Sequence, residues 1–246
     1  MSNLFFGYDP GGNGKHGICI LELQGQSLNV KVCKTVATVK HILTIIDHCK
    51  GNGFRAAGID TFTTWSAAKS GWRASDLWLR NEYKELSTSV LSSNSTSGSM
   101  CINGALVGKC LIDSNKAAII TETHPKVGFP VLTAECHNGE LVFSQYNREN
   151  PLEMVGILRD SLNGVVELSA IPEDICPKGQ FTDHHFDALF SAVVAYLSTL
   201  PADKRGGWMH NLHLGCEKEC LSYPFGEEGK VIYAWPEKPD YEKIHC

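Results

Sequence analysis

The sequence lacks the features that would assign the chain to a membrane or secreted class. It contains no run of about 18 apolar residues, so we expect no segment that spans a membrane. The apolar stretch near the amino terminus is short and ends in an aspartate, which is typical of a buried strand rather than of a secretory signal. The ten cysteines are dispersed from Cys19 to Cys246. We therefore expect a cytoplasmic protein whose thiols are free.

Positive charge is also scarce. The chain has 22 Lys and Arg residues against 27 Asp and Glu residues, which gives a net charge of −5. This balance excludes a generally basic surface of the kind that binds nucleic acid without selectivity, so a nucleic-acid partner would have to contact a local site. No internal repeat and no heptad pattern occur. The sequence leaves the oligomeric state open, and a homodimer is compatible with it.

The length of 246 residues predicts a single enlarged domain over residues 1–246. Within it, residues 61–115 are expected to form an irregular insertion, with a polar loop at 87–99. Residues 201–246 are expected to form a carboxyl-terminal extension.

The first sixty residues alternate short strand patterns with turns. Residues 4–9, 17–23 and 29–37 read as strands joined by a Gly-rich turn and by Gln24-Gly25-Gln26, so they predict an antiparallel meander. Apolar residues at helical spacing then predict a helix over 39–49, with Thr38 as its cap. A strand at 54–60 would follow this crossover and lie parallel to its neighbour.

Later segments continue the same alternation of strands and helices. Residues 116–123 and 229–235 predict strands, whereas 151–162 and 183–200 predict helices. Together these patterns predict an α/β fold: a mixed sheet whose first three strands are antiparallel and whose later strands are parallel, flanked by helices.

Acidic residues stand where otherwise apolar elements end or begin. Asp9, Asp60 and Glu122 each follow an apolar strand pattern, and Asp183 and Asp187 lie four apart at the start of a helix. A single acid at such a place is more often a turn former or, for Asp183, an N-cap. Several acids that converge at strand ends are tolerated chiefly when a cation neutralises them, and hard oxygen ligands favour Mg²⁺ or Mn²⁺.

These acids lie in short motifs that resemble a known family. In chain order the motifs are Gly7-Tyr8-Asp9-Pro10-Gly11-Gly12, Gly58-Ile59-Asp60, GWRASDLWLR with Arg73, Asp76 and Arg80, Thr121-Glu122-Thr123-His124-Pro125, and DHHFDA at 183–188. This order resembles the predicted nucleases of domain-of-unknown-function family 429, which have a ribonuclease H-like fold. The resemblance implies metal-dependent phosphodiester hydrolysis of DNA or RNA.

The resemblance also implies roles for individual residues. The catalytic acids would be Asp9, Asp60, Glu122 and Asp187, with Asp183 as a further candidate metal ligand. Two adjacent acids often begin the family's helix, whereas here His184 and His185 follow Asp183, so the choice between Asp183 and Asp187 as ligand stays open. In a two-metal mechanism one ion activates a water and the other stabilises the leaving oxygen, and Asp9 would bridge them.

Basic residues near these motifs are candidates for contacts with substrate. For phosphate contacts they are Lys15, His16, Arg73, Arg80 and Lys126. The two arginines could instead form structural ion pairs with Asp76 or Glu82. His124 could support Glu122 next to the substrate, or it could simply begin a helix.

A second cluster of metal-ligand types lies near the carboxyl terminus. His210, His213, Cys216 and Cys220 have residue types that suit zinc, but their spacing matches no standard zinc finger, so we favour a loop with free thiols.

Two other functions remain open. A ribonuclease H-like scaffold can act as a binding module without chemistry, and the acidic charge balance is compatible with this. The loop from Gly11 to Lys15 also suggests ATP-dependent phosphotransfer, although it lacks the spacing of a P-loop and the chain is short for two such domains.

Overall fold

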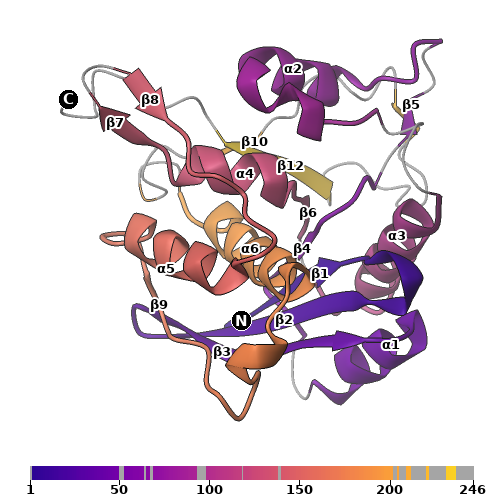
Figure 1. Cartoon of the computed structure of the whole chain (residues 1–246). Helices are drawn as coiled ribbons and strands as arrows, with labels where there is room; N and C mark the ends of the chain where they lie inside the picture. The colour runs from indigo at the N-terminus through magenta and orange to yellow at the C-terminus, as the bar shows by residue number, and fades with distance from the viewer. Residues whose placement is uncertain are drawn as a thin grey trace.

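The computed structural model describes residues 2–49, 53–63, 65–66, 69–92, 98–117, 119–137, 140–201, 204, 209–211, 220–221 and 231–236. Its centre is an eight-stranded mixed sheet with the order β10-β12-β6-β4-β1-β2-β3-β9 (Figure 1). The strands of this sheet are β1 (Leu4–Asp9), β2 (His16–Gln24), β3 (Ser27–Val36), β4 (Ala56–Ile59), β6 (Ile120–Glu122), β9 (Glu167–Leu168), β10 (Met209–Asn211) and β12 (Val231–Pro236). Two small sheets pair β5 (Trp65–Ser66) with β11 (Cys220–Leu221), and β7 (Glu135–His137) with β8 (Glu140–Val142).

The directions of the strands confirm the expected mixed sheet. Strand β2 is antiparallel to both β1 and β3, whereas β4 is parallel to β1. Strand β6 is parallel to β4, and β12 is parallel to β6. The carboxyl ends of β1, β4 and β6 therefore lie side by side at one edge of the sheet.

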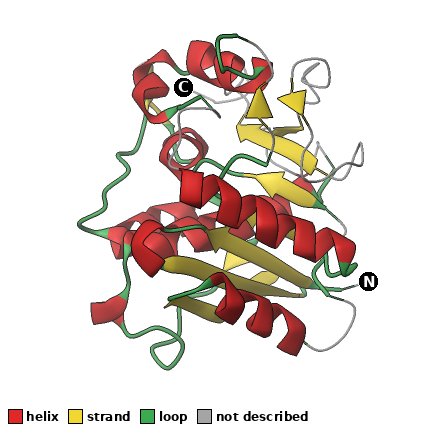
Figure 2. Cartoon of the chain, turned by 90° about the vertical axis from the view of Figure 1, so that its right-hand side faces the viewer, coloured by secondary structure: helices red, strands yellow, loops and turns green. Residues whose placement is uncertain are grey.

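Helices cover both faces of the sheet (Figure 2). The α-helices are α1 (Val39–His48), α2 (Ala74–Glu82), α3 (Gly98–Asp113), α4 (Pro125–Leu132), α5 (Pro151–Ser161) and α6 (Asp183–Ser198). Short 3-10 turns are η1 (Gly12–Gly14), η2 (Lys84–Ser89) and η3 (Lys178–Gln180). Because strand side chains alternate between faces, Phe5 packs with α4, α5 and α6, whereas Phe6 packs with α1 and α3.

Local sequence explains where several helices begin. The Thr38 hydroxyl accepts a hydrogen bond from the His41 amide at 3.3 Å, which caps α1 as the sequence predicts. Helices α4 and α5 each start at a proline, whose fixed φ suits the first helical turn. Among the described residues, no helix is both long and apolar enough to cross a membrane.

Helix α6 is the centre of the molecule. Its residues from His185 to Ser198 are all buried, because the sheet lies on one side and α4 and α5 lie on the other. Glycines on the sheet allow a very close approach: a Cβ atom at Gly7 would lie 1.9 Å from the Ala188 carbonyl oxygen, and one at Gly58 would lie 2.0 Å from that of Ser191. The helix backbone therefore rests directly on β1 and β4.

The segment expected to be irregular contains regular structure. Helices α2 and α3 and the turn η2 all fall within residues 61–115, and α3 begins at Gly98, inside the expected polar loop. Three glycines and an early serine give α3 a low intrinsic helix propensity, so its pattern is weak in sequence. The helix is stabilised instead by packing of Val107 and Leu111 against the face of the sheet that α1 covers.

The carboxyl-terminal segment also contributes to the main sheet. Strand β12 pairs with β6, and β10 pairs with β12. The expected strand at 229–235 corresponds to β12, which ends at Pro236. Residues 201–246 thus supply two strands to the sheet.

Candidate carboxylate site

Two acids lie at the carboxyl ends of neighbouring parallel strands, at the same level of the sheet. Tyr8 of β1 is in register with Ile59 of β4, and the Asp60 amide donates a hydrogen bond to the Tyr8 carbonyl oxygen at 2.9 Å. Asp9 and Asp60 are the next residues on each strand. Since side chains alternate, both carboxylates lie on the face opposite to Tyr8 and Ile59, which is the face that α6 covers.

Asp187 brings a third carboxylate to this place from α6. It lies one turn before Ser191, whose backbone contacts β4, and its side chain is buried. Burial and the charges of Asp60 and Asp9 raise its pKa well above the ordinary value. We call Asp9, Asp60 and Asp187 the acid cluster.

The electrostatics of the acid cluster are unfavourable without a counter-charge. Burial is the largest cause of the raised pKa of each of its members, and the negative charge of Asp9 raises the pKa of Asp60 further. Lys126, an exposed residue in the first turn of α4, lowers the pKa of all three. His184 also lowers the pKa of Asp9, but these two cations do not balance three carboxylates, so the cluster favours either bound protons or a metal cation.

Two members of the cluster have hydrogen-bond partners. His184 Nδ1 lies 2.6 Å from Asp9 Oδ2, and this contact is the largest cause of the raised pKa of His184. The Tyr146 hydroxyl donates to Asp187 Oδ1 at 2.6 Å, and burial followed by the Asp187 charge raises the pKa of this tyrosine. These partners orient the two carboxylates, and the described residues donate no hydrogen bond to the second oxygen of either one.

Asp183 and His185 have structural partners at the start of α6. Asp183 Oδ1 accepts a hydrogen bond from the His184 amide at 3.0 Å, and its Oδ2 lies 3.7 Å from Arg148 Nε. His185 Nδ1 accepts a hydrogen bond from the Thr182 amide at 3.1 Å, which closes a capping box. Burial lowers the pKa of His185 to about 4, so this imidazole is neutral near pH 7.

Glu122, expected to join the catalytic acids, lies on the other face of the sheet. It is in register with Ile59, so alternation directs its side chain away from Asp60. Both carboxylate oxygens bind Arg73 at 2.9 Å, and the amide and hydroxyl of Thr63 donate to Oε1. These donors bind both oxygens of a fully buried group, so Glu122 serves as an ion-pair partner in this structure.

The arginines expected to contact phosphate have internal partners. Arg73 is fully buried and also binds Asp76, with Nε 2.8 Å from Oδ2 and Nη2 2.6 Å from Oδ1. Arg80 donates to the Val90 carbonyl oxygen at 3.2 Å, and its guanidinium lies 5.2 Å from the centre of the Trp72 ring. The expected ion pair with Asp76 is thus present for Arg73, whereas Arg80 contacts a carbonyl oxygen and an aromatic ring.

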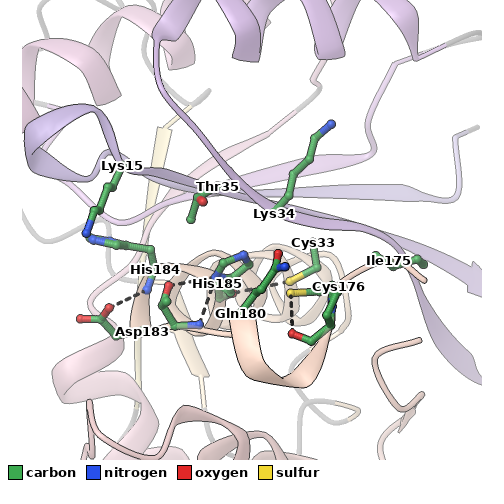
Figure 3. Close-up of a pocket in the computed structure, with 12 residues that line it drawn as sticks. Lys15, Cys33, Lys34, Thr35, Ile175, Cys176, Gln180, Asp183, His184 and His185 are labelled. Carbon is green, nitrogen blue, oxygen red and sulfur yellow. Dashed lines mark hydrogen bonds between the residues drawn. The ribbon is translucent and has the colours of Figure 1, made fainter. Parts of the chain in front are cut away.

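The remaining candidates for substrate binding differ in exposure. His124 precedes α4 and has a ring contact with Phe62 at 5.5 Å, and burial is the largest of the causes that lower its pKa to about 3. His16 is buried and its Nδ1 lies 3.0 Å from the Tyr8 hydroxyl. Lys15, in contrast, is exposed and lines a pocket at the start of α6 (Figure 3).

In the described part of the chain, no three His, Cys, Asp or Glu side chains lie close enough together to hold a metal ion as they stand. His213 and Cys216 lie outside the described residues, while the backbones of His210 and Cys220 belong to β10 and β11.

Tyr146 and Arg148 are contributors that the sequence did not indicate. Both lie between β8 and α5, in a segment without strand or helix periodicity, and they reach α6 from more than thirty positions away. Contacts of this kind depend on tertiary structure, and a single sequence carries no local signal for them.

No protein-family model matches the chain, and neither does any curated protein or solved structure.

Proposed function

We propose that the protein is a nuclease of ribonuclease H-like architecture that hydrolyses phosphodiester bonds with Mg²⁺ or Mn²⁺. The observation that carries the proposal is the acid cluster. Asp9 and Asp60 come from adjacent parallel strands, and Asp187 comes from the helix that rests on them. Such a cluster is costly to the fold, which suggests a functional reason for it.

The arrangement of the sheet supports the architectural part of the proposal. An antiparallel meander of three strands is extended on the β1 side by the parallel strands β4 and β6. This order, with an acid at the carboxyl ends of β1 and β4 and another on a late helix, corresponds to the expectation from the resemblance to family 429.

The chemistry of the donors fits a hard divalent cation. When ionised, the three carboxylates carry more negative charge than Lys126 and His184 balance, which is why their pKa values are raised, and Mg²⁺ or Mn²⁺ would neutralise the remainder. All three members of the acid cluster are carboxylates, whereas softer metals prefer thiolate or thioether ligands. Asp9, Asp60 and Asp187 would hold the metal, with Asp183 at the margin of the site.

When bound, the cation would supply Lewis-acid stabilisation of phosphate and an activated water. The chain's own residues would orient and balance this centre. Tyr146 holds Oδ1 of Asp187 and leaves Oδ2 for a ligand, while His184 holds Oδ2 of Asp9. Lys126, which is exposed beside all three acids, can contact a phosphate oxygen. His184, whose raised pKa favours the protonated ring, can donate a proton to a leaving oxygen.

A second candidate function has one observation in its favour. Asp9 and Asp187 already have hydrogen-bond partners, and the described residues contain no finished group of metal ligands. A ribonuclease H-like binding module that has lost its chemistry would have the same contacts. The two candidates differ in what happens when a carboxylate is removed.

The test compares cleavage by the wild type with that by Asp9→Asn and Asp187→Asn. Single-stranded, duplex, branched and DNA–RNA hybrid substrates are incubated with Mn²⁺, with Mg²⁺ or with a chelator. We expect cation-dependent cleavage of at least one substrate by the wild type, and a loss of at least about 100-fold in each variant. Asp47→Asn, an exposed site on α1, is the matched control and should cleave normally.

Folding of each variant is checked by circular dichroism, since loss of activity is informative only in a folded protein. No cleavage of any substrate by the wild type, together with unchanged melting temperature on addition of either cation, would exclude the nuclease. Binding of nucleic acid that persists unchanged in both Asn variants would then favour the binding module.

A further inference from the structure

A pocket adjoins the acid cluster, and its lining includes basic, apolar and amide side chains that have no role in the cleavage step. It has a volume of about 330 Å³ and lies between β3, the segment before η3, and the start of α6 (Figure 3). His184 joins the two sites, because it lines the pocket and also contacts Asp9 at 2.6 Å. A ligand in the pocket would therefore lie next to the place where a phosphodiester is cleaved.

The two ends of the pocket differ in chemistry. At one end, Figure 3 shows Lys15 pointing toward the ring of His184, with Asp183 beside them. The Asp183 carboxylate reduces the positive charge there only in part, since it also faces Arg148. Lys15 is exposed and can turn its ammonium group to an anion. This end suits a phosphate.

The other end is mainly apolar. Cys33, Ile175 and Cys176 line it, and buried thiols behave as small apolar groups. The amide of Gln180 and the hydroxyl of Thr35 lie between this end and Lys15, where they can donate and accept hydrogen bonds (Figure 3). A flat ring with polar edges fits such surroundings.

We propose that this pocket binds one unstacked nucleotide of the substrate strand, with its phosphate at Lys15 and its base toward Cys33, Cys176 and Gln180. The inference rests on the proposed nuclease function and adds its substrate class. The volume lies at the lower limit of small-ligand sites, which is about 300 Å³, so the pocket admits a single nucleotide and excludes a base pair in a stack. The substrate is therefore single-stranded, or has a base turned out of the duplex, at this position.

The test measures binding of adenosine 5′-monophosphate by isothermal titration calorimetry in a chelator, where no cleavage occurs. We expect binding by the wild type that Lys15→Met weakens by at least about 10-fold, because a charge-assisted contact to phosphate is lost. Gln180→Ala should weaken it by about 2- to 10-fold, the effect of one neutral hydrogen bond. Both residues are exposed, so neither change should unfold the chain.

The matched control is Lys31→Met, which removes the same charge from β3 outside the pocket. Lys31 is half exposed and pairs only weakly with Glu22, at 3.5 Å, so nucleotide binding should be unchanged. A single-stranded oligonucleotide should displace the monophosphate at lower concentration than a duplex of the same sequence. Inorganic phosphate and adenosine alone should each bind more weakly than the nucleotide.

Each outcome decides one point. Failure of the wild type to bind the monophosphate, or equal losses in Lys15→Met and Lys31→Met, would overturn the pocket. Equal displacement by single strand and duplex would overturn the unstacked nucleotide. Asp187→Asn should bind the monophosphate as the wild type does while it fails to cleave. Binding without any cleavage by the wild type would reject the nuclease and retain the nucleotide pocket.

Discussion

Replacing Asp60 by asparagine should stabilise the protein in the absence of metal. Asp60 is the member of the acid cluster whose carboxylate accepts no hydrogen bond from the described residues, so the change removes charge with little loss of contact. Asparagine has nearly the same shape as a protonated aspartate. The change thus removes a charge that burial, followed by repulsion from Asp9, makes unfavourable.

The size of this effect follows from the strand geometry. Neighbouring strands lie about 4.8 Å apart, and two unit charges at about 5 Å repel by about 3 kcal/mol at an effective dielectric constant of 20. Asp60 is partly exposed and Lys126 is nearby, so we expect a gain of about 1–2 kcal/mol in the free energy of unfolding. For a chain of this length the gain corresponds to a rise of about 2–8 °C in melting temperature.

The gain should depend on pH. Burial and the charge of Asp9 raise the pKa of Asp60 in the folded state. The stability that the protonated carboxyl contributes is therefore fully present below its unfolded pKa, which is near 4, and is lost as pH rises through its folded pKa. Wild type and variant should therefore melt at similar temperatures near pH 4. The difference should develop above that pH and persist at pH 7.5.

Thermal unfolding is followed by circular dichroism at pH 4 and pH 7.5, in a chelator and with Mn²⁺. If Asp60 is a metal ligand as proposed, Mn²⁺ should raise the melting temperature of the wild type and have a smaller effect on Asp60→Asn. Asp47→Asn is the control for a neutralised surface acid. If Asp60→Asn were less stable than the wild type at pH 7.5 in chelator, the interpretation of these acids as a repelling cluster would be wrong.

Three further predictions address the surroundings of the site. Arg73→Met should lower the free energy of unfolding, measured by urea denaturation, by about 3–5 kcal/mol, since it leaves Glu122 buried without its cation. Adding Glu122→Gln to this variant should recover part of the loss, because the unpaired charge is then removed. Gly58→Ala should destabilise the fold in the same assay and reduce cleavage, because its Cβ would lie 2.0 Å from the backbone of α6; normal stability would contradict the close packing. The pKa of His184, measured by NMR, should fall in Asp9→Asn, and an unchanged pKa would contradict the contact between the two side chains. In the wild type, the stability that this pair contributes should be fully present below about pH 6.5, the unfolded pKa of histidine, and should be lost as pH rises through the raised folded pKa.

Sequence reasoning predicted the regular part of the fold because local patterns determine it. The strand at Leu4–Asp9, the capped helix α1 and the long helix α6 each have strong periodicity or a clear cap. Helix α3 was not predicted, since its glycines weaken the local preference and its stability comes from tertiary packing.

The candidate site could be predicted only in part. The positions of Asp9 and Asp60 at the carboxyl ends of parallel strands were sufficient to expect that they meet, because such ends share one edge of the sheet. Glu122 was grouped with them by the same reasoning, but it is in register with Ile59 and Tyr8, whereas the two aspartates are each one position further along their strands. A shift of one position reverses the face of the sheet, and sequence does not determine strand ends to that precision.

Because α6 contacts the sheet directly, the register of the helix fixes the position of Asp187 relative to Asp9 and Asp60. Its register is fixed where Gly58 meets the Ser191 backbone, and Asp187 lies one turn away. Each residue turns an α-helix by about 100°, so deleting one residue between Asp187 and Ser191 would swing the carboxylate about a quarter of the way round the axis. Side chains in this short span can vary in size, but the number of residues between the contact and the acid cannot change without separating the carboxylates.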